Sequence, residues 1–242
     1  MTMIVDGYVT LGDGLTRDAL LRQMDAAGVA RAVIAPEDRE LAVYNEEGNQ
    51  RLLAAAGRAG GRFIPACAAT PWRGEEAIAS LDRAVRGGCR LLVFAPAVQG
   101  FMMTDDRVAP LLHRAGELDL TVYVHTGPHS MGAPTQAVLA AQRHPGTRLI
   151  LGHCGSTDHA WDIGAVARCH LADNLFLETS LARPWTVPQY LEAAGADRVI
   201  YASGAPRTDL AFELDRMRET LPVETHPGLY GDNLRRILGE AG

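Results

Sequence analysis

Eight short apolar segments recur along the chain at intervals of roughly 24 to 32 residues, about the length of a strand–helix–strand repeat. Each is a continuous apolar run rather than an alternating pattern, which is typical of parallel strands that are buried on both faces. Their number and spacing predict a (β/α)8 TIM barrel, in which eight parallel strands close into a cylinder surrounded by helices. The segments are Ile4–Val5, Ala32–Ala35, Phe63–Ala66, Leu91–Phe94, Thr121–Val124, Leu149–Leu151, Leu175–Leu177 and Val199–Tyr201.

The length of the chain fits this fold, since 242 residues are close to the about 250 that one such barrel takes. No linker or low-complexity stretch divides the sequence, so we expect one domain over residues 1–242, with an extra C-terminal helix from Asp232 to Leu238. The alternative is an open doubly wound sheet, which carries a glycine-rich phosphate loop after its first strand. Gly12-Asp13-Gly14 lacks that fingerprint, and the barrel is favoured.

Several residues mark where the helices begin and end. Thr16, Thr104 and Thr208 each precede a helical pattern and are expected to cap it. Gly28 is well placed to end the helix that starts after Thr16. Further helix starts are expected at Asn45, Pro134 and Pro188.

The basic residues exclude some classes of function. The formal net charge is −6 and no basic cluster is present, so a large nucleic-acid surface is not expected. The chain contains no lysine, and all 23 of its basic residues are arginine. Catalysis through a lysine Schiff base is therefore excluded, and so is a carbamylated lysine that bridges two metals.

Cysteine usage and apolar patterning indicate a reduced cytoplasmic location. The start of the chain lacks the charged and apolar regions of a signal peptide. No apolar run approaches the ~20 residues of a membrane span. No Cys-x-x-Cys pair is present, and most of the cysteines are expected to be small buried residues. They are Cys67, Cys89, Cys154 and Cys169.

Polar residues at the strand ends identify a candidate site, because the C-terminal ends of all barrel strands open onto one shared pocket. His125 and His153 end two consecutive strand segments, and Glu178 ends the next. A single histidine on an apolar strand is more often structural, but two at neighbouring strand ends favour a site. Alternate residues of the first strand share a face and are expected to meet this group. They are Asp6, Tyr8 and Thr10.

Five short segments follow one another along nearly the whole chain. They are Val98-Gln99-Gly100-Phe101, Val124-His125-Thr126-Gly127, Gly152-His153-Cys154-Gly155, Leu177-Glu178-Thr179-Ser180 and Gly231-Asp232-Asn233. In this ordered set the chain resembles the amidohydrolase-2, or amidohydrolase-related, family of TIM-barrel proteins. The resemblance implies a hydrolase, lactonase or decarboxylase, and the family commonly holds one divalent metal.

The resemblance also implies where a metal would bind. The family's ligands are an H-x-H after the first strand, a histidine after the fifth and an aspartate after the eighth. These positions fall on Tyr8, Thr10, His125 and Gly204 here, and His153 matches a histidine that assists catalysis. Three of the four ligands are missing, whereas zinc normally takes at least three from the protein. We therefore expect no tightly bound metal; a weakly bound divalent ion such as zinc would use His125 and His153.

Six further residues are candidates for binding substrate. Phe94 is expected to form an apolar pocket wall, and Trp72 and Trp185 either flank a flat substrate or anchor loops. Arg183 and Arg207 either pair with a substrate carboxylate or form surface salt bridges. His129 is expected to reach the pocket mouth. The other histidines are expected on loops or helix surfaces: His113, His144, His159, His170 and His226.

Three functions remain open at this point. The first is a metal-independent hydrolase or lyase acting on a small ester, lactone or carboxylate, with His125 as base and His153 donating to the carbonyl oxygen. Glu178 would either orient an imidazole or be a structural partner for an arginine. Asp6 would either orient an imidazole or bond loop amides and hold the first loop. Tyr8 would either wall the pocket or donate to the leaving group. The second is a non-catalytic ligand-binding or scaffold relative, and the third an ordinary hydrolase or decarboxylase that uses one metal. An isologous homodimer is the base-rate expectation.

Overall fold

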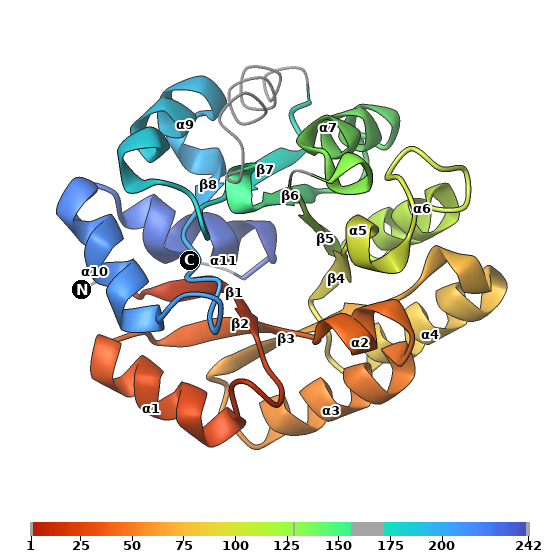
Figure 1. Cartoon of the computed structure of the whole chain (residues 1–242), viewed down its shortest axis with the longest axis horizontal. Helices are drawn as coiled ribbons and strands as arrows, with labels where there is room; N and C mark the ends of the chain where they lie inside the picture. The colour runs from red at the N-terminus through yellow and green to blue at the C-terminus, as the bar shows by residue number, and fades with distance from the viewer. Residues whose placement is uncertain (1, 128, 156–171, 241–242) are drawn as a thin grey trace.

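Eight parallel strands form one sheet in the order β1 to β8, in a computed structural model that describes residues 2–127, 129–155 and 172–240. Figure 1 shows the strands at the centre with the helices in a ring around them. The predicted (β/α)8 barrel is confirmed. The strands are β1 (Val5–Thr10), β2 (Arg31–Ala35), β3 (Phe63–Ala68), β4 (Leu91–Phe94), β5 (Thr121–His125), β6 (Leu149–Gly152), β7 (Leu175–Glu178) and β8 (Val199–Ile200).

The first and last strands approach each other through backbone hydrogen bonds. The N–H of Gly7 donates to the carbonyl of Tyr201 at 2.9 Å, and that of Gly204 donates to the carbonyl of Tyr8 at 3.1 Å. A Cβ atom on Gly7 would lie 2.8 Å from the Tyr201 oxygen, so glycine is needed for this approach. The pairing of β1 with β2 shifts register between Asp6 and Val9, where β1 carries an irregularity.

Helices follow the strands and pack their apolar faces on the sheet. The helices are α1 (Arg17–Ala27), α2 (Asp38–Ala42), α3 (Asn45–Gly57), α4 (Glu75–Arg86), α5 (Pro96–Gln99), α6 (Ala109–Glu117), α7 (Pro134–Arg143), α9 (Val187–Ala194), α10 (Leu210–Thr220) and α11 (Asn233–Ile237). Short 3-10 turns are η1 (Pro71–Arg73), η2 (Ser130–Gly132), η3 (His153–Gly155), η5 (Pro184–Thr186) and η6 (Ala196–Arg198), and the π-helical turn is η7 (Gly228–Asp232).

The helix boundaries follow most of the predictions. Thr16 caps α1 by accepting from Ala19, and Gly28 ends it at φ +72°. The starts predicted at Asn45 and Pro134 are confirmed, and Pro188 is the second residue of α9. Two caps were predicted wrongly. Asp209, rather than Thr208, caps α10, because its carboxylate accepts the N–H of Phe212; after Thr104 the chain makes turns, and α6 begins only at Ala109.

The apolar core has two layers. Alternate strand residues such as Val93 and Ile150 fill the inside of the barrel, while their neighbours pack outwards on the helices. The predicted C-terminal helix is confirmed as α11, and Leu234 and Ile237 join the inner cluster. The carbonyl of Ile237 accepts from the Thr121 hydroxyl at the start of β5, which places α11 at the N-terminal end of the strands. The strand C-termini lie at the opposite end.

The predicted burial of the cysteines is confirmed where the structure describes them. Cys67, Cys89 and Cys154 are buried, and Cys169 lies outside the described residues. No helix within the described part of the chain has the length and apolar character needed to cross a membrane.

Candidate functional site

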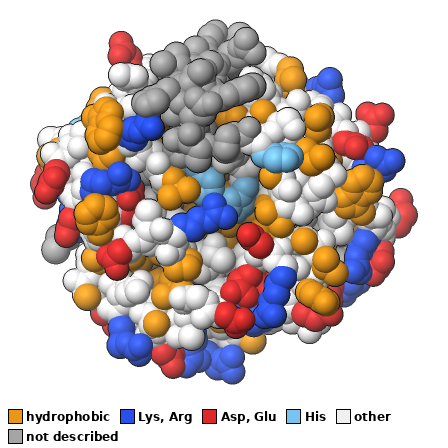
Figure 2. Space-filling view, in the orientation of Figure 1, with side chains coloured by type: hydrophobic (Ala, Val, Ile, Leu, Met, Phe, Trp, Pro, Cys, Tyr) orange, Lys and Arg blue, Asp and Glu red, His pale blue; other side chains and the backbone are white. Residues whose placement is uncertain are grey.

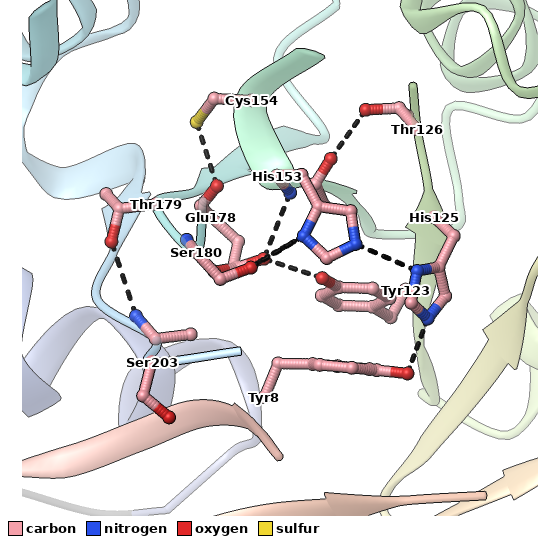
Figure 3. A network of polar contacts seen from close by, with 12 residues as sticks. Tyr8, Tyr123, His125, Thr126, His153, Cys154, Glu178, Thr179, Ser180 and Ser203 are labelled. Atoms are coloured by element: carbon pink, nitrogen blue, oxygen red, sulfur yellow. Dashed lines mark hydrogen bonds and ion pairs between the residues drawn. The ribbon is translucent and has the colours of Figure 1, made fainter. Parts of the chain in front are cut away.

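The two histidines that end neighbouring strands are in direct contact. Nδ1 of His125, at the end of β5, lies 2.9 Å from Nε2 of His153, which follows β6. His153 and Cys154 have φ values of +63° and +45°, a region that residues other than glycine rarely adopt. This backbone conformation directly after β6 places the imidazole of His153 against that of His125 (Figure 3).

The histidine pair is the centre of a continuous chain of side-chain hydrogen bonds (Figure 3). At one end, the Tyr8 hydroxyl lies 2.5 Å from Nε2 of His125. At the other end, Nδ1 of His153 lies 2.6 Å from Oγ of Ser180. Ser180 in turn donates to Oε2 of Glu178 at 2.9 Å. We call these five residues the relay: Tyr8, His125, His153, Ser180 and Glu178.

The single proton of the Ser180 hydroxyl fixes the direction of every bond in the relay. Because Ser180 donates to Glu178, its oxygen must accept from Nδ1–H of His153. Nε2 of His153 is then an acceptor for Nδ1–H of His125, and Nε2 of His125 accepts from Tyr8. These tautomers follow from the network, and all donors point towards Glu178.

Glu178 is fully buried, yet several donors converge on its carboxylate. Oε2 accepts the Tyr123 hydroxyl at 2.6 Å and the backbone N–H of His153 at 3.1 Å, and Oε1 accepts the backbone N–H of Ser180. Burial raises the pKa of Glu178, and the hydrogen bonds from Tyr123, His153 and Ser180 oppose that rise. A carboxyl that accepts from so many donors has the environment of an ionised group.

Burial keeps the other relay residues neutral. It lowers the pKa of His125 well below its ordinary value and that of His153 to about 3, so neither imidazole is a cation at neutral pH. Burial also raises the pKa of Tyr8, which therefore remains a phenol. Tyr8 is held in place by stacking on Tyr123, with ring centroids 4.3 Å apart.

Two cavities meet beside His125 of the relay, which lines both of them. The larger, of about 410 Å³, is lined by polar residues that include Thr10, Glu37 and Arg39. The smaller, of about 170 Å³, is lined by apolar residues that include Ala95 and Val98 and by polar residues that include His153. Asp38, His125 and Arg207 line both. Figure 2 shows histidine, arginine and acidic side chains gathered near the middle of this face.

Two of the predicted substrate-binding residues lie at these cavities. Arg207 lines both, and among the described residues its guanidinium group has no hydrogen-bond or ion-pair partner. His129 lines the smaller cavity, and its Nδ1 accepts the backbone N–H of Met131 at 3.2 Å. Both are exposed and accessible to a ligand.

The other predicted substrate-binding residues lie away from both cavities. Phe94 is wrongly predicted, because Val93 is the residue of β4 that faces inwards, and Phe94 packs outwards against Phe101. Trp72 is 53% exposed and its indole N–H donates to the carbonyl of Gln99 at 2.8 Å, which makes it an anchor for α5. Arg183 and Trp185 lie in the segment before α9, and neither lines these cavities.

Two predicted catalytic roles do not match the geometry. Asp6 touches neither imidazole; in line with its structural alternative, its Oδ1 accepts the backbone N–H groups of Tyr8 and Ser203 at 3.2 and 2.9 Å. Both ring nitrogens of His153 are engaged within the relay, so it is not placed to donate to a substrate carbonyl. Glu178 reaches the His153 imidazole through Ser180, and its role in orienting that ring stays a prediction. His113, His144 and His226 lie on helix or loop surfaces, whereas His159 and His170 lie outside the described residues.

Sequence analysis missed Tyr123 and Ser180, which hold Glu178. Each was detectable from period-two spacing, since Tyr123 precedes His125 by two residues and Ser180 follows Glu178 by two. Asp38 was also missed, because it lies in α2 beyond the end of β2. Gly152 leaves room for the Tyr123 hydroxyl, which a Cβ atom at that position would strike.

The comparisons with known proteins agree with this architecture. The model of the amidohydrolase family matches residues 4–240. The chain belongs to the amidohydrolase family. A comparison with curated proteins finds no match.

Solved structures share the fold of this amidohydrolase at low sequence identity. The 2,6-dihydroxybenzoate decarboxylase from Rhizobium is 17% identical, with 100% of each chain covered and a TM-score of 0.79. A 5-carboxyvanillate decarboxylase from Sphingomonas paucimobilis is 15% identical, with 99% of each chain covered and a TM-score of 0.77. A dihydroxybenzoic acid decarboxylase from Polaromonas, with bound manganese and 2-nitroresorcinol, is 14% identical, covering 99% of this chain and 97% of that one at a TM-score of 0.81.

The family's metal pattern does not fit the side chains of this amidohydrolase. Nε2 of His125 is occupied by the Tyr8 hydroxyl and Nδ1 by His153, so no lone pair of this ring is free for a metal. Gly204 contributes no side chain. In residues 2–127, 129–155 and 172–240, no group of three or more His, Cys, Asp or Glu side chains is arranged to hold an ion. The manganese named above belongs to the Polaromonas protein, and metal independence of this chain stays a prediction.

Proposed function

We propose that this amidohydrolase is a metal-independent hydrolase of a small ester or lactone that carries a carboxylate. The relay is the observation that supports this proposal, because it connects a cavity-lining imidazole to a buried carboxylate through bonds that all point one way. Such a chain accepts a proton at its outer end without building up a buried cation.

Proton transfer from an attacking water would follow the hydrogen bonds. A water that reaches the Tyr8 hydroxyl beside His125 would give a proton to the Tyr8 oxygen, while the proton of Tyr8 moves to Nε2 of His125. The Nδ1 proton of His125 then passes to His153, and that of His153 reaches Glu178 through Ser180. Tyr8, both imidazoles and Ser180 end neutral, and only the Glu178 carboxylate changes charge. This agrees with the directions of the pKa values, since burial disfavours imidazolium and phenolate and favours a neutral Glu178.

The two cavities suit a substrate with an apolar body and an anionic group. Ala95, Val98 and Leu181 line the smaller cavity and would contact a ring or short chain. The guanidinium of Arg207 lines both cavities and has no partner within residues 2–127, 129–155 and 172–240, and it would hold a carboxylate by charge-assisted hydrogen bonds. The reacting carbonyl would then lie beside His125, at the place where the cavities meet.

A substrate screen tests the proposal directly. Purified protein is incubated with carboxylated lactones and aryl esters, and product is measured with wild-type protein and with His125→Ala. We expect wild-type turnover and a loss of at least about 10²-fold in His125→Ala, the range typical of general-base catalysis. Binding of these compounds without turnover would instead support a ligand-binding protein.

Decarboxylation is the second candidate, and the decarboxylases among the similar structures favour it. It needs a proton for the carbon that loses carbon dioxide, so the relay would have to start with Glu178 protonated. The direction of pH dependence separates the two reactions. Hydrolysis by the ionised relay rises with pH to a plateau, whereas decarboxylation by the protonated relay falls as pH rises.

Chelation is expected to leave activity unchanged, because the relay occupies the ring nitrogens that a metal would use. The measurement compares turnover and melting temperature after dialysis against EDTA, and again after adding Mn²⁺ or Zn²⁺. We expect no change in rate and no rise in melting temperature with either ion. Restoration of lost activity by one equivalent of metal would contradict metal independence.

Replacing Arg207 by glutamine is expected to raise KM by about 10-fold for a carboxylated substrate, since a hydrogen bond to a charged group contributes roughly 1.5 kcal/mol or more. The KM of the corresponding neutral amide should change much less. Arg39→Gln is the matched control, because Arg39 lines the larger cavity but already pairs with Glu37 and Asp13 at 3.6 and 3.7 Å. Equal effects of both variants would remove Arg207 from substrate binding.

A further inference from the structure

Gly204, which follows β8, lies directly against Ser180 of the relay. A Cβ atom at position 204 would lie 2.9 Å from Cβ of Ser180 and 3.4 Å from its Oγ. The backbone of Gly204 is fixed on both sides, since its N–H donates to the carbonyl of Tyr8 and its carbonyl accepts from Arg207, both at 3.1 Å. Ser180 is therefore the residue that would have to move.

Ser180 cannot move without breaking the relay. Its Oγ lies 2.6 Å from Nδ1 of His153 and 2.9 Å from Oε2 of Glu178, and the side chain is fully buried. Hydrogen bonds of these kinds weaken steeply beyond about 3.2 Å, so a small displacement away from position 204 would disturb at least one of them.

We propose that Gly204 is a positioning residue of the relay, and that the absence of a side chain at this position allows Ser180 to join His153 to Glu178. The amidohydrolase pattern expects an aspartate metal ligand here, and the first carbon of any such side chain would need the space that Ser180 fills. The relay and a carboxylate ligand after β8 therefore exclude each other. The expected effect of position 204 on kcat/KM rests on the proposed hydrolysis, whereas its expected effect on the hydrogen bonds of Ser180 and His153 does not.

The test compares Gly204→Ala with Ser180→Ala and with a matched control. Gly204 has φ +69°, and Gly28 has φ +72° with no atom within 4 Å of its Cβ position, so Gly28→Ala carries the same backbone strain without the contact. Nitrogen-15 spectra of histidine-labelled protein report which nitrogen of His153 bears the proton, and a His153→Gln variant identifies the signal. We expect the proton of His153 to lie on Nδ1 in wild type and in Gly28→Ala. In Gly204→Ala and in Ser180→Ala we expect it to be shared between Nδ1 and Nε2.

Kinetics and stability supply independent measurements. Ser180→Ala and Gly204→Ala should each lower kcat/KM at least about 10-fold, and the double variant should lose no more than either single variant, because both act through one contact. If Gly204→Ala is too unstable to study, a double variant of Gly204→Ala and Ser180→Gly removes the close contact. The melting temperature of this double variant should rise to that of Gly28→Ala, while its His153 signal remains different from that of wild type.

Any of three results would overturn the proposal. The first is a His153 signal in Gly204→Ala that equals that of wild type. The second is a double variant of Gly204→Ala and Ser180→Ala whose loss of kcat/KM is the product of the two single losses, and the third is a melting temperature of Gly204→Ala that does not rise when Ser180→Gly is added. If the wild-type protein hydrolyses no substrate, but the His153 signal changes in Gly204→Ala and Ser180→Ala as expected, the proposed function fails and the role of Gly204 stands.

Discussion

Replacing Glu178 by glutamine is expected to lower kcat/KM by at least about 10²-fold, and by as much as about 10⁴-fold, while the protein stays folded. The relay ends at this carboxylate, and every donor in it points there. Glutamine has nearly the same shape but no negative charge to neutralise, so the proton taken up at Tyr8 has no group to receive it. The measurement is the steady-state rate with the substrate found by the screen.

Glu213→Gln is the matched control for this variant. Glu213, in α10, is also fully buried, but its carboxylate pairs with Arg216 rather than with the relay. Its replacement should lower the melting temperature without a comparable loss of rate. Full activity in folded Glu178→Gln would show that the relay does not carry a catalytic proton.

The barrel was predictable because its signal repeats. Eight apolar runs at regular spacing imply eight buried parallel strands. Because the prediction rests on all eight runs together, misplacing the bounds of one strand does not change the predicted fold. The convergence of His125 and His153 followed from the same rule, since parallel strands bring their C-terminal ends together.

The relay was less predictable because it depends on backbone geometry that no sequence period encodes. His153 meets His125 only through positive φ values at two consecutive residues other than glycine, His153 and Cys154. Phe94 was misplaced for a related reason. The sequence shows that β4 is apolar throughout, but not which of its alternate residues face inwards.

Asp6 shows most clearly how a carboxylate predicted at the site can be structural instead of catalytic. It is fully buried within β1, and its Oδ1 accepts from the backbone of Tyr8 and of Ser203, which follows β8. Its Oδ2 is buried, with no hydrogen-bond partner among the described residues. Burial raises the pKa of Asp6 from 3.8 to about 7, against the opposing effect of hydrogen bonds from Ser203 and Tyr8. A buried acid with an unpartnered oxygen is stabler neutral than ionised.

This pKa predicts how stability should change with pH. A carboxyl whose pKa is higher in the folded state stabilises the fold fully below about pH 4, and that contribution is lost as the pH rises towards about 7. A rise from 3.8 to about 7 corresponds to an upper bound of roughly 4 kcal/mol in the free energy of unfolding. Asp6→Asn keeps an oxygen for the two backbone N–H groups and cannot ionise.

Asp6→Asn is therefore expected to unfold with nearly the same free energy as wild type near pH 4 and to be the more stable protein at pH 8, by up to a few kcal/mol. Urea denaturation of both proteins at several pH values measures the difference, in which the titration of all other groups largely cancels. Because Asp6 is outside the relay, the variant should keep its activity wherever it is folded. A stability difference that does not vary between pH 4 and 8, or that favours wild type as the pH rises, would mean that Asp6 is ionised in the folded protein and that its second oxygen has a partner.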